Sequence, residues 1–374
     1  MLRKGLFLLL LSAAYLNHVS AQTENEDSLK NTKFYYFKKS GSLTDQRDSA
    51  YFTRIMTPDP AGNKLFILED VYYNGKPRLN GKSLTPGPYF KGQGDFKRYY
   101  PDGQVQETVT YENGKIIGRR TLYYANGKLQ ESATYADGKL TGERMTYYPN
   151  GNKQFIGRYA NGGIALNSAQ FFPNGKPYYT SVFDTTKKLE IIGDAYGLAG
   201  NSTALNGYGT WVTYADTFKR VFSKGPIVNG LKDGEWKGKL SDTLTTFVCV
   251  YKTGVLLSGT TYQESGKVIH FTREEVEPTF KGGLEAFYKL LAANTRYPKQ
   301  AKLDNIQGKV FLSFIIEKDG ELDDIKVVRG IGGGCDEAAV EALKKTSEPW
   351  IPGSQYGLPV HVQYNIPLTF SLQE

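Results

Sequence analysis

A short aromatic phrase followed by a turn recurs along the middle of this chain. YYPDG, YYANG, YYPNG and FFPNG begin at Tyr99, Tyr123, Tyr147 and Phe171, each 24 residues after the last. A second set, TYENG, TYADG and YANG, places Gly114, Gly138 and Gly162 between them at the same interval. Asn-Gly and Asp-Gly supply the positive φ that tight hairpin turns require. Each unit of 24 residues therefore predicts two short strands and two turns.

One such hairpin cannot bury enough apolar surface by itself, so the copies are expected to join into a continuous sheet. Each Tyr pair should then place one ring on the packed face and one on the open face. Over residues 99–176 the sequence resembles the MORN repeat family, and GYGTW (Gly207–Trp211) and GLKDGEW (Gly230–Trp236) continue the pattern loosely. The resemblance implies a long, twisted antiparallel sheet and fixes no ligand.

The first 21 residues have the pattern of a secretory signal. Arg3 and Lys4 precede the apolar run Leu6–Leu16, and Val19–Ala21 ends in small residues, so cleavage is expected after Ala21. An uncleaved membrane anchor is the alternative, although a spanning helix needs about 20 apolar residues. The expected location is the periplasm or cell envelope.

The composition along the chain predicts the following organisation. The expected segments are a signal peptide (1–21), a flexible N-terminus (22–33), a β-rich degenerate repeat region (34–98), a MORN-like repeat sheet (99–262), a linker (263–276) and a final domain (277–374). The predicted fold class is a mainly β repeat sheet of stacked antiparallel hairpins, followed by an α+β domain with a three-stranded antiparallel sheet and two helices.

The last hundred residues change from turn phrases to alternating helical and strand patterns. Apolar residues at helical spacing start at Leu284, and this helix should end before Tyr297-Pro298, because proline disfavours helix at the preceding residue. Lys309–Glu317 predicts a strand, Ile325–Val328 a second strand and Asp336–Lys345 a second helix.

The closing segment predicts the longest strand of the domain. From Val360 to Leu372 apolar residues alternate with polar residues, which indicates one face on a core and one in water. Because the run is longer than the predicted second strand, part of it is expected to lack a partner. Pro367 cannot donate a ladder hydrogen bond and indicates an edge position.

This order of elements resembles the TonB C-terminal domain family, in the version common in Bacteroidetes. The resemblance spans about residues 277–372 and rests on Tyr297-Pro298, Ile306–Gly320, Arg329–Leu343, Trp350–Gly353 and Gly357–Leu372. It implies an energy transducer of the envelope whose last strand accepts an extended segment of an outer-membrane transporter. A complete transducer also has a membrane helix and a Pro-rich linker; here the 16 prolines are scattered and the repeats occupy the linker's place.

Transferred to this chain, the resemblance makes the last strand the acceptor for strand addition. Main-chain hydrogen bonds supply affinity in such complexes, and alternate side chains supply selectivity. The predicted partner-binding residues are Val360, His361, Val362, Gln363, Tyr364, Asn365 and Ile366. The alternatives are that this edge is paired within the domain or in a homodimer.

Charge is unevenly distributed along the chain. Residues 1–270 carry a net charge of +11 and residues 271–374 a net charge of −3, within a total of +8. The basic repeat sheet is suited to anionic envelope lipid or polysaccharide, or it is simply a solvated lysine-rich surface. Nucleic acid is not an expected partner of an exported chain.

The sequence offers little for catalysis, and we predict a non-enzymatic protein without cofactor, metal or catalytic residues. After cleavage only His270 and His361 remain, which leaves almost nothing for a histidine-based site. Cys249 is expected to be a small core residue and Cys335 an inert thiol, and the two could form a disulfide only if the domains dock. GIGGG (Gly330–Gly334) precedes a helix, as phosphate cradles do, but no Lys-Ser or Lys-Thr follows it.

The predicted function is therefore a transporter-binding envelope protein associated with energy transduction. The alternative is a scaffold or adaptor that uses the repeat sheet to bind protein, lipid or polysaccharide.

Overall fold

The computed structural model describes residues 31–372 except 216–217, 241–243 and 347–349. The predicted signal peptide and most of the predicted flexible N-terminus lie outside these residues. The chain divides into two compact units, Met1–Ile191 with Leu198–Asn201, and Ile192–Gly197 with Ser202–Glu374. Within the described residues no helix has the length and apolar character needed to cross a membrane.

The first unit is built from short strands that each pair antiparallel with the next strand in sequence. A 3-10 turn, η1 (Arg47–Ser49), lies between the first two of them. The strands are β1 (Lys33–Phe37), β2 (Phe52–Pro58), β3 (Phe66–Tyr72), β4 (Pro77–Ser83), β5 (Gly92–Tyr99), β6 (Val105–Glu112), β7 (Lys115–Tyr123), β8 (Leu129–Ala136), β9 (Lys139–Tyr147), β10 (Lys153–Tyr159), β11 (Ala165–Phe171), β12 (Pro177–Asp184) and β13 (Leu189–Tyr196), the last of which continues into the second unit.

The second unit continues the antiparallel pattern and then changes architecture. Its repeat strands are β14 (Ser202–Leu205), β15 (Tyr208–Ala215), β16 (Arg220–Val228), β17 (Leu231–Lys232), β18 (Gly234–Lys239), β19 (Thr246–Lys252), β20 (Val255–Tyr262) and β21 (Val268–Phe271). The remaining elements are β22 (Glu275–Val276), α3 (Gly283–Asn294), α4 (Lys299–Leu303), β23 (Gly308–Ile316), β24 (Leu322–Arg329), α5 (Cys335–Lys344), β25 (Ser354–Gln355), β26 (Leu358–Pro359) and β27 (Val362–Phe370).

The alternating turn spacing of the repeats corresponds to two kinds of hairpin. Asn113-Gly114 and Asp137-Gly138 both have positive φ, as a tight two-residue turn requires. At the YYPDG turns only the glycine, for example Gly103, has positive φ, and its amide donates to the carbonyl of Tyr100. The predicted hairpins are therefore confirmed.

The second tyrosine of each phrase links one repeat to the next. The hydroxyl of Tyr100 donates to the carbonyl of Tyr123 at 2.7 Å, and the hydroxyl of Tyr124 donates to that of Tyr147 at 2.7 Å. Tyr148 makes the same bond to Phe171 at 2.8 Å. Each tyrosine thus satisfies a main-chain acceptor at the first residue of the next phrase, which explains why the phrase repeats.

A ladder of ion pairs crosses β5 to β9. Glu107 accepts hydrogen bonds from Arg98 at 3.1 Å and from Arg120 at 2.6 Å, and Glu131 accepts two from Arg144 at 2.6 and 3.0 Å. Arg120 also lies 3.8 Å from Glu131. The arginine and glutamate side chains of this ladder are only partly exposed. They therefore pack over the sheet in the place that apolar side chains would otherwise fill.

In the second unit, glycines allow aromatic rings to lie directly on neighbouring strands. A Cβ on Gly225 would overlap the ring of Trp236, and a Cβ on Gly238 would overlap that of Phe247. Trp236 is almost fully buried and donates its indole N–H to the carbonyl of Pro226 at 2.9 Å. This close approach accounts for glycine at positions 225 and 238.

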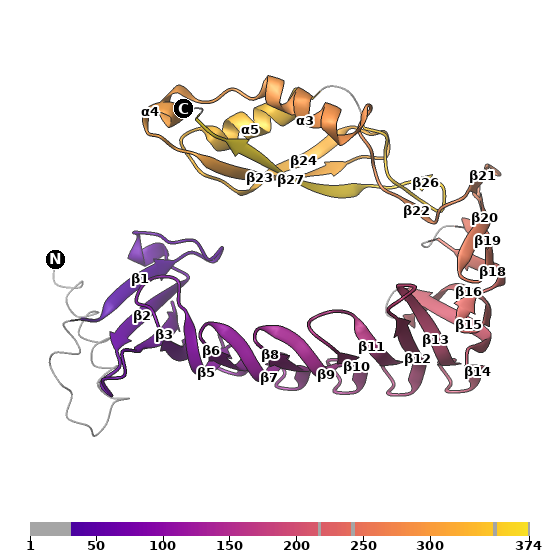
Figure 1. The fold of residues 1–374 in the computed structure, drawn as a ribbon, viewed down its shortest axis with the longest axis horizontal. Helices are drawn as coiled ribbons and strands as arrows, with labels where there is room; N and C mark the ends of the chain where they lie inside the picture. The colour runs from indigo at the N-terminus through magenta and orange to yellow at the C-terminus, as the bar shows by residue number, and fades with distance from the viewer. Residues whose placement is uncertain (1–30, 216–217, 241–243, 347–349, 373–374) are drawn as a thin grey trace. The chain divides into compact units, whose positions relative to one another are not determined.

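The C-terminal part is an α+β domain, as predicted. Its sheet has the order β24-β23-β27, and Figure 1 shows α3 and α5 together on one face of it. Val310, Leu312, Phe314 and Ile316 of β23 are fully buried against these helices, with Trp350 in the same core. Besides the two predicted helices, the structure adds the short helix α4, which starts directly after Pro298.

Candidate functional site

Strand β27 forms one edge of the C-terminal sheet. All nine of its residues pair with β23, from Val362 opposite Ile316 to Phe370 opposite Gly308, without a shift in register. Among the described strands no other pairs with β27. Ile366, Leu368 and Phe370 are buried while the residues between them are exposed. The predicted alternation is confirmed, whereas the expectation that part of the strand lacks any partner is wrong.

Pro367 identifies which main-chain groups face the open side. It lies opposite Phe311 in the middle of the ladder, where a proline is accommodated when its nitrogen points away from the neighbouring strand. Main-chain groups along a strand alternate in direction, so Gln363 and Asn365 share the orientation of Pro367. We infer that the N–H and C=O groups of Gln363 and Asn365 point to the open edge.

The opposite edge of the sheet, β24, is built differently. Its pairing with β23 is interrupted by two register shifts, and Asp324 has a positive φ. Charged residues such as Asp323 and Lys326 project from it, whereas β27 contains no charged residue. Bulges and charges discourage the addition of another strand, and a regular, uncharged edge permits it.

The structure places the predicted acceptor residues in two groups. Val362 to Ile366 lie in β27, but Val360 and His361 precede it. The amide of Val360 already donates to the carbonyl of Gly353 at 2.9 Å, and His361 Nδ1 lies 2.5 Å from a carboxylate oxygen of Glu317. The strand starts later than its sequence pattern indicates because Leu358–Pro359 pairs with β25 instead. The open edge therefore begins at Val362.

The hairpin before β27 packs on the end of the repeat strands in the same unit. The ring of Tyr356 stacks on Phe247 at 4.1 Å and lies 5.8 Å from Phe222 and from Phe271. Its carbonyl accepts a hydrogen bond from the hydroxyl of Thr261 at 2.6 Å. These contacts, which the sequence analysis missed, anchor the chain directly in front of the edge strand.

The first unit contains a hollow of about 440 Å³ where the ion-pair ladder stops. The position held by Arg144 in one repeat is Ser168 in the next, and that of Glu131 is Phe155. Replacing a long ion pair by a serine and a ring leaves the space unfilled. The hollow is thus a consequence of two substitutions within an otherwise regular repeat.

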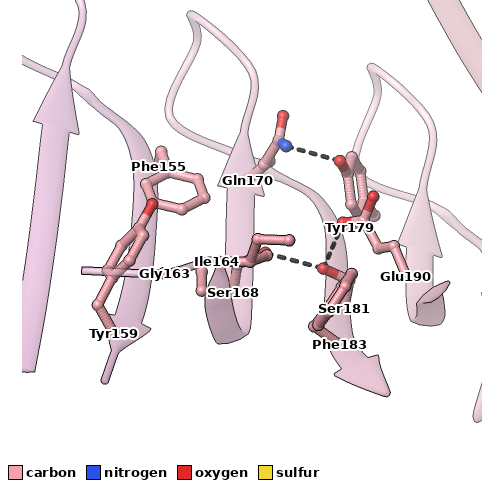
Figure 2. A pocket seen from close by; sticks show the side chains of 11 residues that line it. Phe155, Tyr159, Gly163, Ile164, Ser168, Gln170, Tyr179, Ser181, Phe183 and Glu190 are labelled. Atoms are coloured by element: carbon pink, nitrogen blue, oxygen red, sulfur yellow. Dashed lines mark hydrogen bonds between the residues drawn. The ribbon is translucent and has the colours of Figure 1, made fainter. Parts of the chain in front are cut away.

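Figure 2 shows how the polar groups of this hollow satisfy one another. The hydroxyl oxygens of Ser168 and Ser181 lie 2.8 Å apart, and the Ser181 hydroxyl donates to the carboxylate of Glu190 at 2.6 Å. The amide of Gln170 donates to the hydroxyl of Tyr179 at 2.6 Å. Neither histidine nor cysteine is among the residues that line it.

The other residues considered for chemistry are occupied or buried. Both cysteines are free and buried; burial raises the pKa of the Cys249 thiol to about 12 and also raises that of Cys335. At the GIGGG segment, the Asp336 carboxylate accepts hydrogen bonds from the amides of Ile331 and Gly332. Those amides are thus not available to a phosphate. Within the described residues, no group of three or more His, Cys, Asp or Glu is placed to hold a metal ion.

Comparison with known families identifies the two architectures. Residues 293–372 match the family model of the Gram-negative bacterial TonB protein C-terminal region. The chain carries a TonB C-terminal domain. Residues 93–113, 116–137 and 140–161 match the MORN repeat variant model. MORN repeats therefore precede the TonB C-terminal domain, and the match lies within 93–161, whereas the sequence indicated the resemblance over 99–176.

Curated relatives support the assignment of the TonB C-terminal domain. Protein TonB from two strains of Helicobacter pylori, J99 and 26695, is 35% identical to this chain over 85 residues, which is 22% of the chain. The match spans 29% and 28% of those proteins. Two NMR solution structures of the H. pylori TonB C-terminal domain are 33% identical to this chain, cover 24% of it and 81% and 95% of their own length, and give TM-scores of 0.20.

Proposed function

We propose that this is an exported protein of the cell envelope whose TonB C-terminal domain binds an extended segment of an outer-membrane TonB-dependent transporter by strand addition to β27. The observation that carries the proposal is the regular, uncharged edge of β27, which pairs with β23 on one side only among the described strands. The H. pylori proteins that this domain resembles are themselves named protein TonB.

Strand addition would use the groups that β27 leaves open. The main chain of Gln363 and Asn365 offers donors and acceptors to an incoming strand, at about 1 kcal/mol net for each hydrogen bond. The exposed side chains of these residues would select the partner's sequence. Pro367 ends the run of donors, so Val362–Ile366 would be the length of edge that a peptide occupies.

The alternative function is a scaffold or adaptor in which the repeats bind envelope partners. It is favoured by the anchoring of Tyr356 on Phe247, which holds the TonB C-terminal domain against the repeat strands of its unit. A homodimer through β27 would use the same open edge. Both alternatives predict that transporter peptides do not bind.

Proline substitutions on β27 test the proposal. In an Asn365→Pro variant we expect the sheet to form as it does around Pro367 and the affinity for transporter peptides to fall at least tenfold, since a main-chain donor and room for the added strand are lost. The peptides are copied from the periplasmic N-terminal segments of the host's own TonB-dependent transporters. Affinity is measured by calorimetry on the full chain.

A Thr369→Pro variant is the matched control. Thr369 shares the strand and the orientation of Asn365 but lies beyond Pro367, outside the expected contact, so binding should stay within about twofold of the unmodified protein. Equal losses in both variants, with unchanged circular dichroism, would argue against an acceptor at Val362–Ile366. Absence of binding by the unmodified protein at millimolar peptide would favour the scaffold function.

A further inference from the structure

The first unit contains a second hollow that differs in chemistry from the one in Figure 2. It has a volume of about 360 Å³ and lies over β1, β2, β4 and β5. Four cationic residues, Lys39, Arg54, Arg78 and Arg98, line it, and no carboxylate does. We call it the arginine groove.

The arginines of the groove differ in how fully they are neutralised. Arg54 is buried and uses all its nitrogens, Nε and Nη2 on Asp70 and Nη1 on the carbonyl of Pro88. Arg78 donates only Nη1 to the same Asp70, and Arg98 donates only Nε to Glu107. Asp70 is therefore shared between two arginines, and Glu107 is shared with Arg120. Cationic charge exceeds carboxylate charge at the groove.

The excess charge also affects Arg78 itself. Burial lowers the pKa of its guanidinium, the attraction of Asp70 opposes that effect, and repulsion from Arg98 and Arg54 adds to it. An anion placed between Arg78 and Arg98 would relieve this repulsion. Guanidinium groups bind carboxylates through paired N–H donors, which gives such a site both strength and geometric selectivity.

Aromatic rings form the rest of the groove. Arg78 lies 3.8 Å from the centre of the Phe52 ring, and Phe52 stacks on Phe37 at 4.6 Å. Tyr89 also lines the groove and is 71% exposed, so its ring is open to a ligand. The C–H groups on one face of a pyranose ring form an apolar patch that packs against an exposed aromatic side chain.

We propose that the arginine groove binds a carboxylated polysaccharide segment, with a uronate carboxylate between Arg78 and Arg98 and its sugar ring against Tyr89. The site is independent of β27 and of the transporter-binding function. It combines charge complementarity with an aromatic platform, and both are needed to distinguish an acidic sugar from a bare anion. Inorganic phosphate would reach the guanidinium groups but would gain nothing from Tyr89.

Calorimetric titration of the full chain tests the site with three ligands of matched chemistry. An oligogalacturonate should bind saturably, and its methyl ester, which lacks the negative charge, should bind at least tenfold more weakly. Inorganic phosphate should also bind at least tenfold more weakly than the oligogalacturonate. Equal affinity for phosphate, equal affinity for the methyl ester, or no saturable binding of the acid would overturn the proposal.

Single substitutions distinguish binding at the arginine groove from non-specific attraction to the overall positive charge of the chain. Arg98→Gln should weaken oligogalacturonate binding roughly tenfold, while Arg119→Gln, an exposed arginine on β7 outside the groove, should leave it within about twofold. Tyr89→Ala should weaken it several-fold, and its exposed ring can be removed without disturbing the fold. Unchanged binding by Tyr89→Ala, or equal losses for Arg98→Gln and Arg119→Gln, would contradict the site.

Discussion

An Asp70→Asn variant is expected to lose about 3–5 kcal/mol of the free energy of unfolding of the first unit, because it leaves buried arginine charge without a carboxylate. Asp70 is fully buried and accepts hydrogen bonds from both Arg54 and Arg78. Asparagine keeps the shape of the side chain but not its charge. Urea denaturation followed by far-ultraviolet circular dichroism measures the loss.

The three tryptophans give this experiment an internal reference. Trp211, Trp236 and Trp350 all belong to the second unit, so their fluorescence is expected to change less than the circular dichroism. Asp95→Asn is the matched control, because Asp95 is exposed on β5 and should cost less than about 0.5 kcal/mol. If Asp70→Asn lost no more unfolding free energy than Asp95→Asn, the buried ion pairs of Asp70 would not contribute to stability.

Truncation of Tyr356 to alanine is the second change with a large expected effect, about 3–5 kcal/mol of the free energy of unfolding of the second unit. The ring is buried against three aromatic residues, and its removal leaves a cavity between the hairpin and the repeat strands. Tryptophan fluorescence reports the unfolding of both parts of this unit, since Trp236 lies in the repeat strands and Trp350 in the core of the TonB C-terminal domain.

A matched tyrosine in the same unit controls for the loss of an aromatic ring. Tyr262 on β20 is 45% exposed, and Tyr262→Ala should cost less than about 1 kcal/mol. If Tyr356→Ala unfolds in two separate transitions, the hairpin is what couples the domain to the repeats. If Tyr356→Ala is as stable as Tyr262→Ala, the contacts of Tyr356 with the repeat strands do not contribute to stability.

The repeats show how far a periodic sequence determines structure. Asn113-Gly114 and Asp137-Gly138 could be assigned to tight turns because few other residue pairs adopt positive φ twice in succession. The hydrogen bonds of Tyr100 and Tyr124 to the next repeat could not be predicted. These bonds depend on how successive turns are displaced from one another in space, and the spacing of the glycines along the sequence does not determine that displacement.

The C-terminal domain was predictable where burial alternates strictly and less so where hairpins intervene. The alternation of apolar residues from Val310 to Ile316 correctly predicted which face of β23 is buried. Pro367 correctly predicted that β27 is an edge strand. The start of β27 was placed two residues early because Val360 and His361 continue its alternation. Tyr356 was missed because an aromatic residue before Gly357 does not resemble a hairpin turn, although both have positive φ.

The central claim is that an extended peptide adds to β27, and amide hydrogen exchange of the full chain with and without a transporter peptide tests it most directly. Bound peptide should slow exchange at Gln363 and Asn365, whose N–H groups face the open edge, and should leave β24 unchanged. Slower exchange confined to the repeats or to β24, or no change in β27 under conditions where the peptide is bound, would contradict the account.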